Sequence, residues 1–357
     1  MFSDFFLKSF RILLLPFALV YMGIIFVRSW LYDKKHFQSV SFGLPVICVG
    51  NLSVGVTGKS PMVEYLVKNL KTGFKVATLS RGYKRKTSGY ALANNDSTAL
   101  EIGDEPMLFH LKFPDVPVAV GEKRIEAIPQ LLHDRPDTQV IILDDAFQHR
   151  QIKPGLNILL TDYNNLFTRD FYLPAGDLRD LKSNYKRAEI IVVTKCNSGF
   201  TRENASEVIT EINPQEHQKL FFTTLDYGQL YHITGKKNFI LDENTEVLLV
   251  SGIANPRPLQ KLLEDVCKSY SMLHYADHHI FTIDDLKDIK SKFEAIEGKN
   301  KIILSTEKDA VRLAKFKSDV YELPLYIIPI RHRFLFDGAE QFNNTVYNFI
   351  KEFKKAD

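Results

Sequence analysis

A glycine-lysine-serine triplet stands at residues 58–60, within the segment GNLSVGVTGKSP (50–61). An apolar run, PVICVG (45–50), precedes the triplet, and an amphipathic stretch from Lys59 to Lys71 follows it. Backbone N–H groups and the helix dipole at such a strand-to-helix turn attract phosphate. We expect Lys59 to reach the β- and γ-phosphates of a nucleotide and Ser60 to ligate Mg²⁺. The alternative is a surface turn that carries these residue types by chance.

The loop departs from the complete Walker A pattern G-x-x-x-x-G-K-[ST], because Ser53 occupies the position of its first glycine. Gly55 lies inside the loop and supplies conformational freedom there. The predicted nucleotide site therefore comprises the strand end and the loop, namely Asn51, Ser53, Val54, Gly55, Val56, Thr57, Gly58, Lys59 and Ser60.

A pair of acidic residues, Asp144 and Asp145, ends the apolar run in VIILDDAFQHR (140–150). In a nucleotide-binding protein, an aspartate at the end of a buried strand holds Mg²⁺ directly or through water. A solvated strand end is the simpler interpretation of the pair taken alone. Its combination with the loop at residues 50–61 favours a metal site.

Further titratable residues occur in GDEP (103–106) and YADHHIF (275–281). Asp104 and Glu105 could serve chemistry, or they could belong to a turn that caps a helix. Adjacent histidines point in different directions on a regular element, which argues against one metal bound by both. Basic residues recur in SRGYKRK (80–86), EKR (122–124) and DLRDLKS (177–183). These basic residues suit an anionic substrate, or simply a solvated surface.

Several apolar runs separated by helical stretches must position these groups. The runs 45–50, 74–80, 117–121, 140–145, 157–162 and 189–195 predict buried strands of a parallel sheet with helices on both faces. Residues 220–246 alternate and turn, as an antiparallel linker would, and 247–253, 301–309 and 326–330 predict a second, smaller α/β domain. The predicted division is 1–36, 37–219, 220–246 and 247–357, with a P-loop core of α/β class in the second part.

Composition supports a folded protein with no general affinity for nucleic acid. The 357 residues are 45% hydrophobic and 25% charged, and 46 basic residues almost balance 43 acidic ones. The cysteines, Cys48, Cys196 and Cys267, have no metal-binding spacing and indicate a reducing compartment. Nothing in the sequence indicates an obligate protein partner.

The N-terminus contains an uncharged run, ILLLPFALVYMGIIFV (12–27), bracketed by Arg11 and Arg28. Sixteen helical residues rise roughly 24 Å, slightly less than the hydrocarbon core of a bilayer. Nearby aromatic and basic residues suit the membrane interface, namely Phe5, Phe6, Phe10, Trp30, Tyr32, Lys8, Lys34 and Lys35. No small-residue cleavage site follows, which argues against a signal peptide. We predict a membrane-associated helix; a helix buried in the protein is the alternative.

Nine segments in order make the chain resemble the tetraacyldisaccharide 4′-kinase (lipid A 4′-kinase) family, from the apolar helix to about residue 313. They are GNLSVGVTGKSP, LSRGYKRK, GDEP, LDDAFQHR, LPAGDLRD, VVTKC, VSGIANP, DHHIF and STEKDAVRL. The family loop usually reads V-G-G-T-G-K, whereas this chain has Val56 at the second glycine.

The resemblance implies an ATP- and Mg²⁺-dependent kinase on the cytoplasmic side of the inner membrane. Such an enzyme phosphorylates the 4′-hydroxyl of tetraacyldisaccharide 1-phosphate and yields lipid IVA. It also implies that Asp104 is the catalytic base with His278 as its partner, beside Lys59, and that Glu105, Asp144 and Asp145 arrange the metal. Residues expected along the substrate or phosphate path are Arg81, Tyr83, Arg124, Gln148 and Arg179.

Two other functions are compatible with parts of the sequence. A membrane-attached regulatory P-loop NTPase would hydrolyse ATP without phosphorylating a lipid, and would need no base for an acceptor hydroxyl. A membrane-tethered binding protein without enzymatic activity would not bind ATP–Mg²⁺. A kinase assay with the lipid acceptor separates all three.

Overall fold

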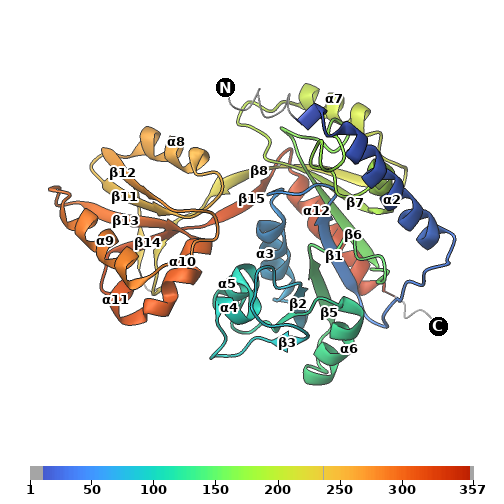
Figure 1. Cartoon of the computed structure of the whole chain (residues 1–357), viewed down its shortest axis with the longest axis horizontal. Coiled ribbons are helices and arrows are strands. Elements are labelled where there is room, and N and C mark those ends of the chain that lie inside the picture. The colour runs from blue at the N-terminus through green and yellow to red at the C-terminus, as the bar shows by residue number, and fades with distance from the viewer. Residues whose placement is uncertain (1–10, 236, 354–357) are drawn as a thin grey trace.

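The computed structural model describes residues 11–235 and 237–353 and contains two β-sheets, each with helices on both faces (Figure 1). Phe5, Phe6, Phe10 and Lys8 of the predicted membrane flank lie outside the described residues. We call the domain built on the nine-stranded sheet the large domain and the one built on the six-stranded sheet the small domain.

The sheet of the large domain has the strand order β15-β8-β7-β6-β1-β5-β2-β4-β3. All neighbouring pairs are parallel except the two edge pairs, β15 with β8 and β3 with β4. The strands are β1 (Val46–Asn51), β2 (Val76–Ser80), β3 (Ala91–Leu92), β4 (Val118–Val120), β5 (Val140–Asp144), β6 (Leu156–Asp162), β7 (Ile190–Thr194), β8 (Lys219–Tyr227) and β15 (Ile330–Phe334).

Two hydrophobic clusters cover the two faces of this sheet, because successive strand side chains point to opposite sides. Cys48 of β1 joins the cluster beneath α6 and α7, whereas Ile47 and Val49 join the cluster beneath α3 and α12. The helices are α3 (Lys59–Leu70), α4 (Ala99–Ile102), α5 (Asp104–Lys112), α6 (Arg124–Asp134), α7 (Arg202–Ile212) and α12 (Gly338–Lys351), with a 3₁₀ helix η1 (Lys182–Arg187). This arrangement confirms the predicted P-loop-like parallel core.

The sheet of the small domain has the order β10-β9-β14-β13-β11-β12. Its strands are β9 (Leu230–His232), β10 (Asn238–Phe239), β11 (Glu246–Ser251), β12 (Ser269–His274), β13 (Lys301–Thr306) and β14 (Leu325–Ile328). Its helices are α8 (Arg257–Val266), α9 (Ile283–Glu294), α10 (Glu307–Leu313) and α11 (Lys317–Tyr321), with a 3₁₀ helix η2 (Ala314–Phe316).

The chain crosses between the domains twice, side by side. It leaves the large domain along β8 and returns along β15, and these two strands pair antiparallel from Thr223–Phe334 to Tyr227–Ile330 (Figure 1). The sequence-based division includes residues 330–357 in the second unit, whereas the strand order assigns β15 and α12 to the large domain. A short apolar strand carries no local mark of which sheet it joins, because its pairing partner, β8, lies more than a hundred residues earlier.

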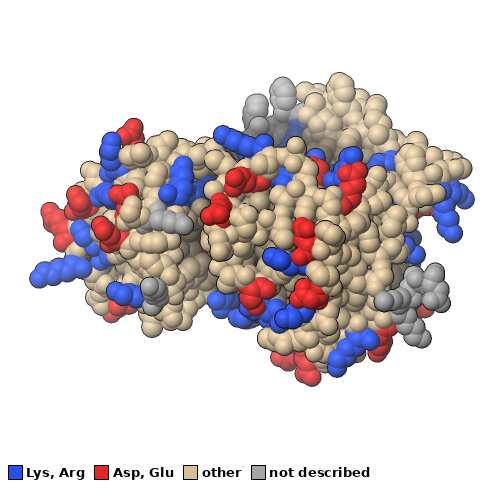
Figure 2. Space-filling model, turned by 90° about the horizontal axis from the view of Figure 1, so that it is seen from below, with Lys and Arg blue, Asp and Glu red and all other residues tan. Residues whose placement is uncertain are grey.

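Helix α2 (Leu15–Asp33) lies on the outside of the large domain. Among its buried residues are Ala18 and Ile25, and the Tyr21 hydroxyl donates to the carbonyl of Arg179 at 3.1 Å. The opposite side exposes large apolar side chains, including Phe17 and Ile24, which are 65% and 62% exposed. α2 is long and apolar enough to cross a membrane and is mostly not buried in the protein. Figure 2 shows basic and acidic side chains interspersed on the face of the molecule seen from below.

Candidate active site

The loop between β1 and α3 is shaped by two glycines with positive φ, Gly55 (+95°) and Gly58 (+84°). A Cβ on Gly58 would also approach the ring of His332 to 3.0 Å. The Nε2 atom of His332 donates to the carbonyl of Gly58 at 2.8 Å. Burial lowers the pKa of His332 to about 4, so the neutral ring accepts from the Thr223 hydroxyl at its Nδ1 atom. Glycine is therefore required at position 58 by both conformation and space.

The missing glycines at positions 53 and 56 do not disturb the loop. Ser53 forms an extended antiparallel bridge with Leu178, and neither Ser53 nor Val56 has a positive φ. Val56 is 67% exposed, so its side chain points into solvent. Inside the loop, the Asn51 side-chain amide donates to the Thr57 hydroxyl at 2.9 Å, which holds the loop against the end of β1.

The two adjacent aspartates at the end of β5 occupy different environments. Asp145 is paired with Arg179 and lies 3.7 Å from the Nζ atom of Lys59, the first residue of α3. Asp144 is 3% exposed, and its Oδ1 atom has no hydrogen-bond partner among the described residues. Burial, together with Glu105 and Asp145, raises the pKa of Asp144 to about 7. A buried carboxylate oxygen without a donor suits a cation supplied from outside the chain.

Glu105 connects the phosphate loop to the small domain. Its Oε1 atom accepts from the Ser60 hydroxyl at 2.7 Å and from the Nζ atom of Lys308 at 2.6 Å. Burial alone would raise the pKa of Glu105, but Lys308 and Ser60 outweigh it and lower the pKa. Ser60, Glu105 and Asp144 thus fit a Mg²⁺ site of hard oxygen donors. No group of three or more acidic, histidine or cysteine side chains among the described residues holds a metal by itself, so phosphate and water oxygens would complete the coordination.

Asp104 and His278 come together from different domains. Asp104 begins α5, after Gly103 with a φ of +94°, and His278 lies in the loop after β12. The Nδ1 atom of His278 is 2.9 Å from the Oδ2 atom of Asp104. Burial would raise the pKa of Asp104, but the hydrogen bonds from His278 and Arg312 outweigh it and lower the pKa to about 2. His279 points elsewhere, with its Nε2 atom 2.9 Å from Asp285.

Some of the predicted substrate residues are exposed or lie beside the phosphate loop, whereas Arg124 is buried. Arg81 and Tyr83 are exposed, and the Tyr83 ring lies edge-on to the His278 ring at 5.9 Å between centroids. Gln148 donates to the carbonyl of Asn51, beside the phosphate loop. Arg124 is only 1% exposed, and its guanidinium donates to backbone carbonyls at 3.1 and 3.2 Å. The structure thus brings Tyr83 to the ring of His278 and Gln148 to the loop, but places Arg124 inside the large domain.

The comparisons with known proteins agree over nearly the whole chain. The tetraacyldisaccharide-1-P 4′-kinase family matches residues 10–351. The chain belongs to this family. It is 42% identical to a tetraacyldisaccharide 4′-kinase of Bacteroides thetaiotaomicron, with 95% of this chain and 93% of the relative covered. A Flavobacterium johnsoniae tetraacyldisaccharide 4′-kinase is also 42% identical, with 96% and 98% covered.

The fold agrees with a solved member of the tetraacyldisaccharide-1-P 4′-kinase family. The crystal structure of the apo form of LpxK from Aquifex aeolicus in complex with ATP matches with a TM-score of 0.74 at 28% identity. The match covers 96% of this chain and 99% of that one. Membership of the family confirms the resemblance that the nine segments indicate.

Three basic residues at this kinase site carry contacts that the sequence did not indicate. Arg312 binds Asp104, Lys308 binds Glu105, and Lys195 binds Asp162 at 2.7 Å and the carbonyl of Val56 at 2.5 Å. Arg312 and Lys308 lie in STEKDAVRL (305–313), where charged residues directly follow an apolar strand. An apolar strand also precedes Asp144, so the same signal could have singled out Lys308. Arg312 stands in the second turn of α10 and lacks that signal.

Proposed function

We propose that this chain is an ATP-dependent kinase that phosphorylates the 4′-hydroxyl of tetraacyldisaccharide 1-phosphate and so produces lipid IVA. The observation that supports it most is the contact of Asp104 with His278 beside the phosphate loop, within a chain of this family. A carboxylate at that place can accept a proton from a hydroxyl that attacks the γ-phosphate. A regulatory NTPase has no need for such a group.

The nucleotide would lie on the loop at residues 50–60. Backbone N–H groups at the start of α3 and the Lys59 ammonium group favour its phosphates. Ser60, Glu105 and Asp144 would hold Mg²⁺, with Asp145 fixing Lys59 and Arg179 nearby. When bound, the metal neutralises charge on the phosphate oxygens.

The role proposed for Asp104 follows from which of its oxygens is occupied. Its Oδ2 atom receives His278 and Arg312, and no described residue hydrogen-bonds to Oδ1. Oδ1 would therefore receive the proton as the hydroxyl oxygen bonds to phosphorus and ADP leaves. A pKa of about 2 makes Asp104 a weak base. Phosphoryl transfer tolerates this, because its loose transition state needs positioning more than proton abstraction.

The site is complete only when the domains touch. α5 of the large domain packs against α10 of the small domain, and charge pairs run along the contact. Asp104 pairs with Arg312 and Glu105 with Lys308, while Lys112 contacts Glu307 at 2.5 Å. Separation of the domains would therefore remove Arg312 and His278 from Asp104. It would also remove Lys308 from Glu105, while Glu105 would keep its hydrogen bond from Ser60.

The proposed location is the cytoplasmic face of the inner membrane. The exposed apolar side of α2 supports attachment to a bilayer, where the acylated acceptor resides, while ATP is supplied from the cytosol. The acceptor or the transferred phosphate would be faced by Tyr83, Arg81, Gln148 and Arg179. Arg124 would act from inside the domain, through the backbone of residues 121–122.

The test uses the purified chain in detergent with labelled ATP, Mg²⁺ and tetraacyldisaccharide 1-phosphate. We expect label on the acceptor, and mass spectrometry should locate the new phosphate at the 4′ position. ATP hydrolysis without labelled lipid would instead support the regulatory NTPase. Label at another hydroxyl would support the lipid kinase activity but would show that the 4′-hydroxyl is not the acceptor.

A further inference from the structure

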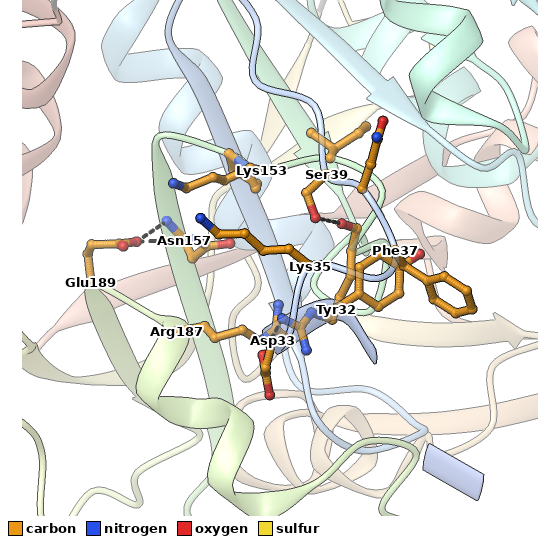
Figure 3. A pocket seen from close by; sticks show the side chains of 13 residues that line it. Tyr32, Asp33, Lys35, Phe37, Ser39, Lys153, Asn157, Arg187 and Glu189 are labelled. Atoms are coloured by element: carbon orange, nitrogen blue, oxygen red, sulfur yellow. Dashed lines mark hydrogen bonds and ion pairs between the residues drawn. The ribbon is translucent and has the colours of Figure 1, made fainter. Parts of the chain in front are cut away.

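A pocket lies at the end of α2, away from the phosphate loop. Its volume is about 650 Å³, and it opens between the chain that follows α2 and the edge at which β6 and β7 begin (Figure 3). The nucleotide loop follows the carboxyl end of β1, which is parallel to β6. The loop therefore lies at the carboxyl ends of the parallel strands, and the pocket lies at their amino ends.

The walls of this pocket carry an excess of positive charge. Four basic side chains, Lys35, Lys153, Arg150 and Arg187, face two acidic ones, Asp33 and Glu189. Figure 3 shows the ammonium groups of Lys35 and Lys153 extending toward the side on which Asn157 lies.

The arginines are already partnered inside the protein. Arg150 pairs with Asp33 at 2.6 Å, and Arg187 pairs with Asp180 at 3.3 Å. Glu189 accepts from the backbone N–H of Asn157 at 2.6 Å.

Lys35 and Lys153 differ from those arginines, because the ammonium group of neither has a hydrogen-bond or ion-pair partner among the described residues. Arg150 and Asp33 are fixed to each other, so Asp33 does not neutralise the lysines. The Glu189 carboxylate, held by the backbone N–H of Asn157, offsets one of the two lysine charges, so the pocket keeps a net positive charge. The two ammonium groups suit an anion with several oxygen acceptors.

We infer that this pocket binds the phosphate group of an anionic phospholipid headgroup; the inference rests on the proposed attachment of α2 to the membrane. Lys35 and Lys153 supply the charge, and Tyr32 with Phe37 forms an aromatic wall, their rings 5.2 Å apart. Aromatic rings beside basic residues are typical of the headgroup region.

The source of the phosphate follows from the position of the pocket. The apolar side of α2 stays exposed as far as Val27 and Trp30, which are 54% and 45% exposed, and the pocket begins at Tyr32. A bilayer that covers the apolar side thus places its headgroups beside the pocket. One bound headgroup would fix the rotation of the large domain on the membrane.

The experiment compares vesicle binding of the full chain to phosphatidylcholine with and without phosphatidylglycerol. The pocket variant is Lys35→Gln with Lys153→Gln, and the matched control is Lys68→Gln with Lys186→Gln, which removes equal charge from exposed positions outside the pocket. We expect the pocket variant to lose about fivefold in phosphatidylglycerol-dependent affinity per lysine. The control should lose much less, and turnover on detergent-solubilised acceptor should stay within about twofold of the unmodified chain in both.

Each other outcome rejects the inference in a distinct way. Equal losses in both variants would mean diffuse surface attraction, and no loss in either would mean that the lysines touch no headgroup. Inorganic phosphate that binds the detergent-solubilised chain through these lysines, with vesicle affinity unchanged, would assign the pocket to a soluble anion. An unmodified chain that binds no vesicles would reject membrane attachment and the headgroup site together, whereas kinase activity is measured independently in detergent.

Discussion

Arg312 of the small domain donates two hydrogen bonds, from Nε and Nη2, to the same Oδ2 atom of Asp104 in the large domain, at 3.0 and 2.7 Å. A third contact joins that oxygen to the Nδ1 atom of His278. The proposed base is thus held by the domain that it does not belong to. Its charge and position depend on domain contact.

Replacing Arg312 with glutamine should raise the pKa of Asp104 from about 2, since two charged donors are lost. Asp104 must be ionised to accept a proton, so the acid limb of kcat should move to higher pH. Charged hydrogen bonds of about 1.5–3 kcal/mol predict a loss of roughly 10- to 100-fold in kcat. Arg331→Gln, at an exposed position, is the control. An unchanged pH profile with reduced stability would make Arg312 only structural.

Asp104→Asn and His278→Gln should each lower kcat by ~10²–10⁴-fold with modest change in ATP affinity, because both act on one proton transfer. The double variant should lose much less than the product of the single losses. His279→Gln is the matched control, because His279 binds Asp285 instead. If the losses in kcat of the two single variants multiply in the double variant, Asp104 and His278 do not act as a unit. A greater loss in kcat for His279→Gln than for His278→Gln would assign the role of partner to His279.

Lys59→Ala should reduce turnover by at least ~10²-fold, because the phosphates lose their cationic contact. Thermal melting of the apo chain should change little, since the contacts of the Lys59 ammonium group are long: a 3.4 Å hydrogen bond to the carbonyl of Gly55 and a 3.7 Å ion pair with Asp145. Lys68→Ala, at an exposed position of the same helix, should keep normal turnover. Near-normal activity of the Lys59 variant would remove the loop from the reaction.

Val20→Glu combined with Ile24→Glu should weaken vesicle binding, because both positions are on the exposed apolar side of α2, at 64% and 62% exposure. Turnover on detergent-solubilised acceptor should be retained. Ile209→Glu on α7, also exposed, provides the control. Full sedimentation of the α2 variant with membranes would assign the attachment to another surface.

The burial of His332 should make the free energy of unfolding depend on pH. Its pKa is about 4 in the folded chain because of burial, against about 6.5 when unfolded. The unfolded chain therefore binds a proton that the folded chain does not, and the free energy of unfolding falls as pH drops from about 6.5 toward 4. The loss reaches roughly 3 kcal/mol.

Urea unfolding at several pH values between 7 and 4 measures this slope. His332→Asn should be less stable at pH 7 and should show a shallower loss at lower pH. His36→Asn, at an exposed site, should keep the full slope. An identical slope in both variants would assign the acid sensitivity to another group, such as His149, whose pKa burial also lowers to about 4.

The sequence by itself determined the phosphate loop, the parallel core and the apolar helix. Each rests on local order: glycines at positions 55 and 58 between an apolar strand and a helix, runs of buried residues, and sixteen uncharged residues in succession. Such patterns reflect backbone conformation and burial, which neighbouring residues largely decide. The family resemblance added roles for residues whose local pattern left alternatives open.

Only the tertiary structure decided how those residues meet. Asp104 and His278 are separated by 174 positions, and the Oδ2 atom of Asp104 is also bound by Arg312, 208 positions away. The family resemblance places Arg124 along the substrate or phosphate path, yet its side chain is buried inside the large domain. Strand β15 joins the sheet of the large domain, although the sequence-based division puts it in the second unit. Contacts between distant segments depend on strand order and domain packing, for which the local sequence carries no separate signal. The physical reason is that hydrophobic burial is non-directional, so apolar strands of similar composition could pair in many orders with similar burial.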